Sequence, residues 1–458
     1  MRRWRSLLPV VIAIVGSSPA AGQRRPERFD GWTRMTFSQA EYRDRRRRLL
    51  DAVTADGGGV FLMPSASGLT GGDTFRQNEN FLYFTGLELP RSMLVVDADR
   101  RTVTLYVPPR DPRWESSTRP NDFPGRDLGL DSAVVRMAAA DSVLPSERLA
   151  GRIDELVRSG RRLIVDQGSG LDGRPQLIPE EGITPELEMV LALANRYPDL
   201  HPANGSRLIA RLRMVKSPAE IAAIERAVLA AASAMRQVAR RARPGVTERA
   251  LIGAFEAACR REGAVRFPFT PIIKSGPNAL WPWRILASHY DRRNRALAAG
   301  DIVIFDVGCE LDYYVSDIGR TFPVGARFSP GQRRAVELVT AVSDSILKVI
   351  RPGMTLADVQ RVAFAAIPPA ERRYMQTGSY FGHHIGMSSG DPADLSVALA
   401  PGMVFTVEPW YYNHDSGVAA FVEDNVVVTT DGLTVLSRRL PRSPGELEAL
   451  HAGRAKPD

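Results

Sequence analysis

Residues 301–321 read DIVIFDVGCELDYYVSDIGRT, and this segment sets two carboxylates in apolar, strand-like surroundings. The apolar run that ends at Asp306 is typical of a buried strand, and residues 308–313 can turn the chain. A second run, from 315 to 321, then returns it with Asp317 embedded. In such a hairpin the two carboxylates lie close together if both point to the same face. They would repel each other and lose solvation, and a bound cation would remove both costs.

Three further metal-ligand types follow along the chain. His383 lies in Phe-Gly-His-His-Ile-Gly, Glu408 follows an apolar run at 403–407, and Glu423 precedes Val426-Val-Val428. Taken singly, each is ordinary, because a strand Asp is usually a turn or cap group and a buried His is usually a hydrogen-bonded core residue. Together, four carboxylates and one imidazole are too anionic for a lone tetrahedral zinc site. They suit two divalent ions such as Mn²⁺, which would activate water and polarise a carbonyl for amide hydrolysis.

Helix signals upstream and downstream of the first apolar run repeat in the same order. A capping box with proline at its second position begins a helix at Ser217, and Arg-Pro-Gly at 243–245 ends it before Thr247 caps another helix, to about Gly263. A second capping box at Ser329, Arg-Pro-Gly at 351–353 and a cap at Thr355 repeat the pattern. We interpret this as an internal duplication, with two α/β halves around a pseudo-two-fold axis.

Residues 36 to about 200 predict a separate α/β domain. Strands are expected at 59–63, 92–97, 102–107 and 162–166, and a long loop at 111–128. The arginine run at 45–48 is interpreted as the solvated face of an amphipathic helix.

The first residues have the layout of a signal peptide, predicted at 1–22. Three arginines precede a short apolar run at 7–15 and a stretch of small residues. We therefore expect an exported protein, periplasmic or extracellular, with an uncleaved N-terminal anchor as the alternative and no permanent membrane span after leader removal. Export would permit a disulfide, but two buried free thiols are expected at Cys259 and Cys309 because the sequence does not show that they meet.

Composition argues against a nucleic-acid partner. The 458 residues carry a net charge of +8, but the positive charge is almost all arginine scattered along the chain, whereas nucleic-acid binders usually cluster it.

Several motifs together resemble the aminopeptidase P and prolidase peptidases. The segments that carry the resemblance are 306–310, 316–324, 401–409 and 422–424 around the carboxylates, 42–50 and 76–86 in the first domain, and 216–221 at the start of the second. The resemblance implies an α/β (α+β) fold, with an accessory domain over 36–200 and a duplicated "pita-bread" catalytic domain over 207–445. It also implies a homodimer or homotetramer.

The same resemblance implies roles for individual residues. The metal ligands would be Asp306, Asp317, His383, Glu408 and Glu423. Glu408 would also be the general base, His289 would hydrogen-bond the substrate or intermediate, and Tyr412 would be a further active-site residue. The expected cofactor is a pair of divalent ions, Mn²⁺ first, with Zn²⁺ or Co²⁺ as alternatives. The expected reaction is removal of the N-terminal residue of a peptide substrate at Xaa-Pro bonds, by attack of a hydroxide bridging the two metals.

Three positions depart from the family pattern. Ser379 and Gly390 stand where the family has histidines, and Phe421 stands where it has arginine. His384 and His414 are candidate substitutes for the missing histidines. These departures favour, as the alternative, a catalytically altered relative that acts as a binding protein or hydrolyses a non-proline amide. Retention of all five ligands argues against pure binding, because unused buried carboxylates are destabilising.

Overall fold

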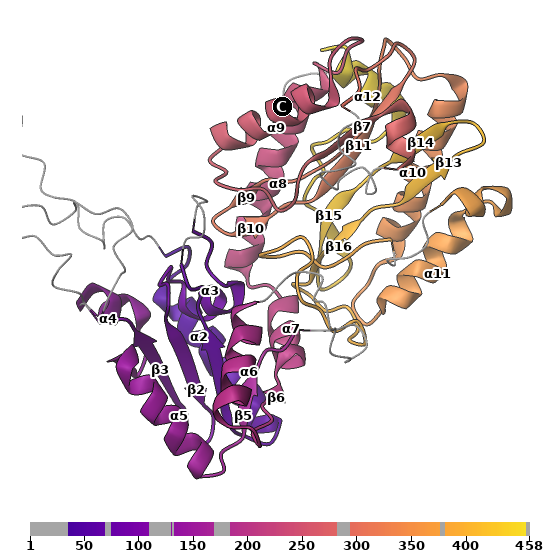
Figure 1. The fold of residues 1–458 in the computed structure, drawn as a ribbon. Coiled ribbons are helices and arrows are strands. Elements are labelled where there is room, and N and C mark those ends of the chain that lie inside the picture. The colour runs from indigo at the N-terminus through magenta and orange to yellow at the C-terminus, as the bar shows by residue number, and fades with distance from the viewer. Residues whose placement is uncertain are drawn as a thin grey trace, which may run out of the picture.

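The computed structural model describes residues 35–68, 75–109, 130, 132–168, 184–281, 294–375 and 381–454. They form a smaller N-terminal domain and a larger C-terminal domain (Figure 1). The predicted signal peptide, the loop at 111–128, His289 and Ser379 lie outside these residues.

A six-stranded sheet forms the centre of the N-terminal domain. Its order is β4-β3-β2-β1-β5-β6, with β1 Val60–Pro64, β2 Met93–Asp97, β3 Thr102–Val107, β4 Ser142–Pro145, β5 Leu163–Val165 and β6 Ala203–Asn204. Strands β1, β2 and β3 pair antiparallel, and the outer pairs are parallel. The four predicted strands are confirmed. The helices of this domain are α2 Gln39–Ala55, α3 Glu79–Thr85, α4 Ser132–Ala138, α5 Leu149–Arg158 and α6 Pro185–Arg196.

The interpretation of the arginine run as a solvated face is wrong for two of its members. Arg45 and Arg46 on α2 are buried. Arg45 lies over the Tyr83 ring and donates to the Tyr83 carbonyl at 3.1 Å, while Arg46 donates to the Phe84 carbonyl at 2.8 Å. Guanidinium groups can be buried where fixed carbonyls and aromatic faces replace water, and the sequence did not show that α3 supplies both.

Two helix pairs build the C-terminal domain, as the repeated cap signals predict. After α7 Ser206–Met214 come α8 Pro218–Ala239 with α9 Glu248–Arg261, and later α10 Pro330–Val349 with α11 Leu356–Ala366. Both sides of the capping box are formed at Ser217, Ser329 and Thr355. Helix α12, Pro444–His451, follows the last strand.

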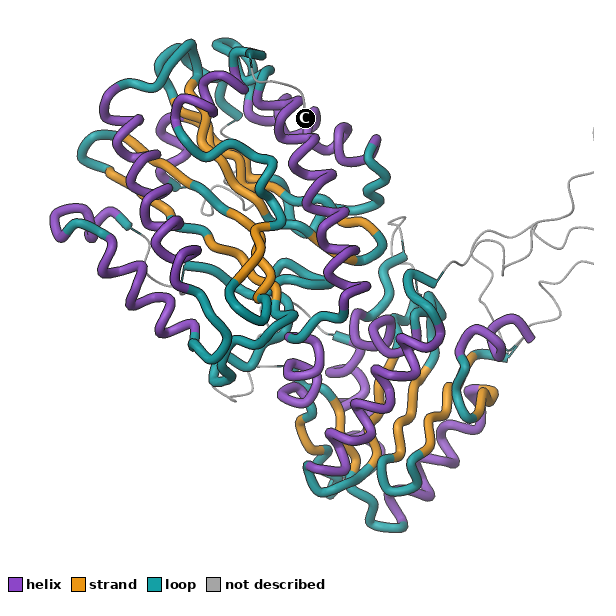
Figure 2. Tube along the Cα trace, turned by 180° about the vertical axis from the view of Figure 1, so that it is seen from behind, coloured by secondary structure: helices purple, strands orange, loops and turns teal. Residues whose placement is uncertain are grey.

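The strands of this domain lie between the helix pairs (Figure 2). One sheet has the order β11-β8-β7, from Ile318–Pro323, Ile302–Val307 and Ile272–Ser275, and another has the order β12-β15-β16, from Val404–Val407, Asp424–Val428 and Leu433–Val435. The hairpins β9–β10, Glu310–Leu311 and Tyr314–Val315, and β13–β14, Trp410–Asn413 and Val418–Phe421, complete the set. Every residue of β8, β11, β12 and β15 is buried. Short 3₁₀ helices lie at Ser146–Arg148, Gly276–Leu280 and Pro369–Tyr374.

The prediction of two free thiols is wrong, because Cys259 and Cys309 form a disulfide. Cys259 lies on α9 and Cys309 lies two residues after the end of β8. Their Cα atoms are 5.8 Å apart, a separation typical of disulfides. The packing of α9 beside this strand brings together two residues that are 50 positions apart, which no local pattern reveals.

Among the helices of the described residues, none combines the length and apolar character needed to cross a bilayer.

Candidate metal centre

The first two candidate ligands meet through the pairing of β8 and β11. Asp306 stands opposite Gly319, and Asp317 directly precedes β11. Both side chains are buried, and they lie close enough that the charge of Asp306 helps to raise the pKa of Asp317. The hairpin expected from the sequence is therefore present, with the small β9–β10 hairpin at its turn.

A second strand pair brings in the two glutamates. Glu408 directly follows β12 and Glu423 directly precedes β15, and these strands pair antiparallel with Val407 opposite Asp424. The backbone N–H of Glu423 donates to the Gly319 carbonyl at 2.9 Å, and the Gly319 N–H donates in return at 3.2 Å. This bridge joins the two sheets at the point where their carboxylates lie.

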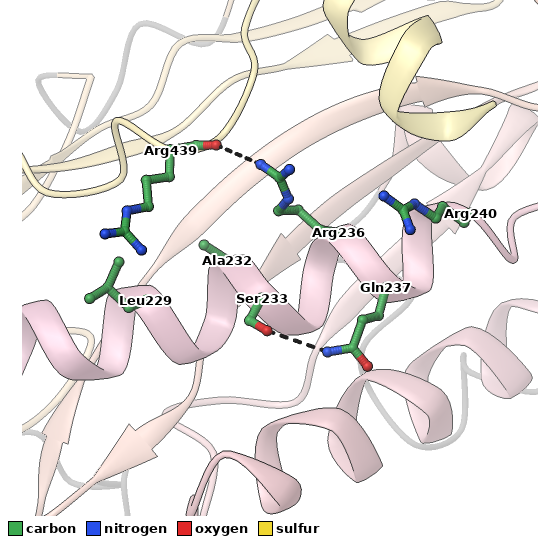
Figure 3. A pocket seen from close by; sticks show the side chains of 7 residues that line it. All are labelled: Leu229, Ala232, Ser233, Arg236, Gln237, Arg240 and Arg439. Atoms are coloured by element: carbon green, nitrogen blue, oxygen red, sulfur yellow. Dashed lines mark hydrogen bonds between the residues drawn. The ribbon is translucent and has the colours of Figure 1, made fainter. Parts of the chain in front are cut away.

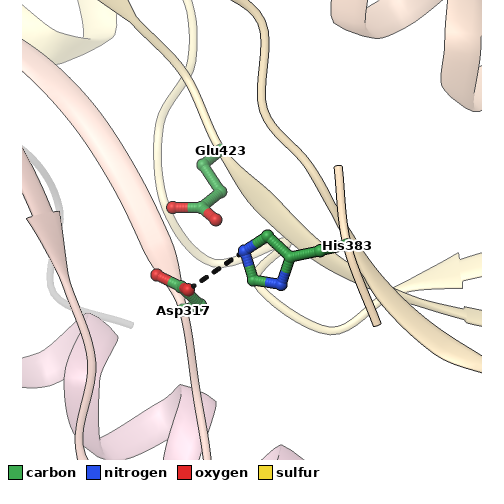
Figure 4. A group of neighbouring side chains, drawn as sticks. All are labelled: Asp317, His383 and Glu423. Atoms are coloured by element: carbon green, nitrogen blue, oxygen red, sulfur yellow. Dashed lines mark ion pairs between the residues drawn. The ribbon is translucent and has the colours of Figure 1, made fainter. Parts of the chain in front are cut away.

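His383 reaches the same point from a segment that runs along β12. The Thr406 N–H donates to the His383 carbonyl at 2.9 Å, which aligns the two segments. The His383 Nε2 atom lies 3.2 Å from Glu408 Oε1 and 3.6 Å from Asp317 Oδ2. Its Nδ1 lies 3.3 Å from the His384 carbonyl oxygen. A proton on Nδ1 would satisfy that contact and leave Nε2 as the ligand atom. Figure 4 shows His383 facing Asp317 and Glu423.

The electrostatics of this cluster favour a cation. Burial, together with the Glu408 charge, raises the pKa of Asp306 well above its ordinary value. Burial and the neighbouring carboxylates likewise raise the pKa values of Asp317 and Glu423. Each group resists ionisation because it has lost water and faces like charges.

The residues present fit divalent metal ions. Ligand atoms of Asp317, His383 and Glu423 all lie within 4.8 Å of one another. Asp317 Oδ1 and Glu423 Oε2 are buried and have no hydrogen-bond partner within the described chain. Buried carboxylate oxygens rarely lack a partner, so these atoms are suited to coordination. A set of carboxylates with one imidazole suits Mn²⁺ and similar ions better than thiolate-selecting metals.

Polar neighbours that are not among the residues predicted from the sequence hold the candidate ligands. The Thr406 hydroxyl accepts from the His383 N–H at 3.0 Å and donates to Glu408 Oε1 at 2.9 Å. The Asn425 side chain accepts from the Asp317 N–H at 3.0 Å. The buried Arg320 donates to the Glu423 carbonyl at 2.6 Å. Thr406 shares a strand face with position 408, so the two-residue period could have identified it.

Comparisons with known proteins agree with this geometry. Residues 222–430 match the model of metallopeptidase family M24, and residues 42–165 match that of the aminopeptidase P N-terminal domain. This chain's C-terminal domain is therefore a domain of metallopeptidase family M24. Its domain order is that of aminopeptidase P: accessory domain first, pita-bread domain second.

Relatives match this chain over nearly its whole length. Mouse Xaa-Pro aminopeptidase 3 is 28% identical over 90% of this chain and 86% of its own. The Xaa-Pro aminopeptidase of Escherichia coli K12 is 28% identical over 90% and 98%. A low-pH crystal form of E. coli aminopeptidase P is 26% identical with a TM-score of 0.72, covering 91% of this chain and 99% of that one.

Three other residues singled out from the sequence, Tyr412, His384 and His414, differ in how they lie relative to the carboxylates. Tyr412 lies beside the carboxylates, where burial and the Asp306 and Glu408 charges raise the pKa of its hydroxyl; that hydroxyl is buried without a partner in the described residues. His384 is buried beside Phe405, with ring centroids 6.0 Å apart, and burial lowers its pKa to about 3. His414 is exposed and packs on Trp281 at 4.6 Å between ring centroids.

A separate groove lies along α8 (Figure 3). It encloses about 350 Å³ and is lined by Leu229, Ala232, Ser233, Arg236, Gln237, Arg240 and Arg439. None of the candidate ligands lines it, so this groove is separate from the candidate metal centre.

Proposed function

We propose that this chain removes the N-terminal residue from peptides at Xaa-Pro bonds, with two divalent metal ions held by Asp306, Asp317, His383, Glu408 and Glu423. The observation that carries the proposal is the meeting of side chains from five separate segments around one buried cluster. Such a cluster of buried carboxylates is costly unless a cation compensates it. The relatives that are named Xaa-Pro aminopeptidases supply the substrate class.

The residues of the chain would divide the work of hydrolysis. Bound ions would supply an activated water at neutral pH and polarise the scissile carbonyl. Glu408 accepts the proton of the attacking water and passes it to the amine of the leaving peptide. Tyr412 holds a proton on its hydroxyl, because its pKa is raised, and can donate a hydrogen bond to the developing oxyanion. We assign His289 to the same oxyanion or to the substrate.

Metal identity and location are parts of the same proposal. The donor set favours Mn²⁺, with Zn²⁺ or Co²⁺ as alternatives. The leader-like residues 1–22 and the disulfide both support export to an oxidising compartment. N-terminal sequencing of the protein recovered from the periplasm or medium would test this: a mature chain that begins near residue 23 supports export by a cleaved leader.

The test of activity uses purified protein that is first stripped and then reloaded with Mn²⁺. Xaa-Pro dipeptides, longer Xaa-Pro peptides and matched Xaa-Ala peptides are supplied in parallel, with Glu408→Ala as the blank. We expect release of the first residue from the Xaa-Pro peptides and loss of that activity in the variant. About two metal ions per chain by elemental analysis would support the ligand set. Failure to release a residue from any peptide with metal bound would overturn the proposal.

A second candidate is removal of N-terminal residues from peptides without proline. Phe421, where the family has arginine, favours it. A relative whose name does not specify an Xaa-Pro bond is the mitochondrial intermediate cleaving peptidase 55 of Arabidopsis thaliana, which is 26% identical over 90% of this chain and 82% of its own. Higher kcat/KM on the Xaa-Ala peptides than on the Xaa-Pro peptides would favour this candidate.

A further inference from the structure

Both oxygens of the Glu408 carboxylate are held by neighbours on the same segment. Thr406 donates to Oε1 at 2.9 Å, and the indole N–H of Trp410 donates to Oε2 at 3.2 Å. Trp410 is only 1% exposed, so its N–H contact is shielded from water. A hydrogen bond from a fixed donor to a carboxylate is stronger than one between neutral groups.

Aromatic packing fixes the orientation of that indole. Trp410 pairs with Phe421 across β13 and β14, and the two rings stack with centroids 3.5 Å apart and planes 19° apart. The Tyr412 ring stacks on the indole as well, with centroids 5.6 Å apart and planes 17° apart. Such stacking leaves the indole little rotational freedom.

Strand β11, which begins directly after Asp317, supports the same stack of rings. Phe421 packs directly on Gly319, where a Cβ atom would overlap the Phe421 ring. Gly319 stands opposite Asp306 and shares backbone hydrogen bonds with Glu423. Gly319, Phe421 and Trp410 therefore connect the backbone beside two ligands with the carboxylate of a third.

We propose that Trp410 is a positioning residue, whose indole N–H fixes the carboxylate plane of Glu408 for metal binding and proton transfer. The inference rests on the role of Glu408 given above and adds the group that orients it. A carboxylate with one oxygen released could rotate, and the geometry needed for both tasks would be lost. Groups that orient metal ligands typically contribute 10- to 100-fold to affinity or activity.

Two variants separate the N–H contact from the packing. Trp410→Phe keeps an aromatic ring in the stack and removes the donor. Phe421→Leu disturbs the stack and keeps the donor. Replacement of Trp410 by the benzothienyl isostere, in which sulfur stands in place of the N–H group, keeps both size and stacking and serves if the Phe variant folds poorly.

Three measurements are made on each full-length variant. They are Mn²⁺ affinity from the electron paramagnetic resonance signal of free Mn²⁺, kcat and KM on an Xaa-Pro peptide, and Tm. We expect Trp410→Phe and the isostere to weaken Mn²⁺ binding and lower kcat by about 10- to 100-fold, with KM nearly unchanged. Phe421→Leu should lower Tm as much or more, but it should lower Mn²⁺ affinity and kcat less than the isostere does, because the loosened indole still carries its N–H donor.

Either of two results would overturn the inference. Unchanged Mn²⁺ affinity and kcat in the isostere variant would show that the N–H group is dispensable. Larger losses in Phe421→Leu than in Trp410→Phe would assign the effect to packing rather than to the N–H group. If the unaltered protein cleaved no peptide, the proposed function would fail, but the Mn²⁺ affinities would still decide the role of Trp410.

Discussion

At the scale of single residues, Glu423 shows why the centre needs a cation. Its side chain is 1% exposed, and burial and the charges of Asp317, Glu408 and Asp306 raise its pKa. Ionisation of such a group is unfavourable in the folded protein, because the group has lost its water and faces other negative charges. The ligands are therefore a source of instability in the metal-free protein and of metal affinity when ions bind.

This leads to a pH dependence of the metal-free protein. The pKa values of Asp306, Asp317 and Glu423 lie above their unfolded values, so the folded state binds more protons than the unfolded state. The contribution of these three groups to the free energy of unfolding is then largest at acid pH and falls as pH rises from about 4. The lowered pKa of His384 acts in the opposite direction up to the ordinary pKa of histidine, so the comparison is made above that value. We expect the chelated protein to unfold at lower urea concentration at about pH 8.5 than at about pH 7.

Added metal should reverse this trend, since the ions compete with protons for the same oxygens. Urea unfolding with Mn²⁺ and with chelator, across the same pH range, measures the stabilisation by metal. We expect this difference to widen as pH rises. A chelated protein that becomes more stable between about pH 7 and about pH 8.5 would contradict the assigned directions of the carboxyl pKa values.

The candidate ligands could be picked out from the sequence, while most of the residues that support them could not. Asp306, Asp317, Glu408 and Glu423 are acids in apolar runs, which is an uncommon pattern with a chemical explanation. Trp410 carries no such signal, because a tryptophan in an apolar run is ordinary core until its N–H is seen to face a carboxylate.

At the scale of elements, the contact of β11 with β14 depends on one glycine. A Cβ atom at Gly319 would overlap the Phe421 ring. We expect Gly319→Ala to lower the free energy of unfolding by about 1–3 kcal/mol through overpacking. In a Phe421→Ala background the same Gly319→Ala change should cost less, because the ring that the new Cβ atom would overlap is gone. A double-mutant cycle measured by urea unfolding gives this coupling energy. Additive effects of the two changes would show that they do not share this contact.

The disulfide joins α9 to the loop that follows β8, close to Asp306. Closing a loop of this length typically contributes about 2–5 kcal/mol to stability. We expect Cys259→Ser with Cys309→Ser to lower the free energy of unfolding by an amount in this range. Dithiothreitol should destabilise the unaltered protein and leave the double variant unchanged. Equal stability of the two proteins without reductant would exclude a stabilising disulfide.

Local patterns explain which elements were predictable. Cap residues such as Ser217, Ser329 and Thr355 determine helix starts through contacts within one turn, so they are read directly from sequence. The errors, at Arg45, Arg46 and the two cysteines, concern contacts between elements far apart in the chain. Those contacts depend on packing rather than on periodicity.

At the scale of the whole molecule, buried charges tie the two domains together beside the centre. Arg213, on the linking helix α7, donates to Glu79 of the first domain at 2.8 Å and to Asp391 of the second at 2.6 Å. Lys216 donates to the same aspartate at 3.1 Å. Asp391 also accepts from the Met387 N–H at 3.1 Å, in the loop that follows His383.

Loss of the Asp391 charge should therefore weaken both the domain contact and the ligand loop. We expect Asp391→Asn to lower the free energy of unfolding by about 3–5 kcal/mol, because the buried Lys216 loses its carboxylate partner and Arg213 keeps only the Glu79 carboxylate. Urea unfolding followed by fluorescence and far-ultraviolet circular dichroism would measure it. Asp51→Asn, which breaks an exposed pair with Arg101, is the matched control and should change stability little. Similar losses in both variants would contradict a special role for the buried network.

The oxidised link beside Asp306 also bears on how the enzyme matures. A polypeptide threaded through a translocon arrives reduced and unfolded, so both the disulfide and the hairpin that carries Asp306 and Asp317 would form after export. If the leader directs such a route, the ions would be drawn from the destination compartment rather than from the cytosolic pool. The metal abundance of that compartment, more than intrinsic ligand preference, would then select the ion found in the native enzyme.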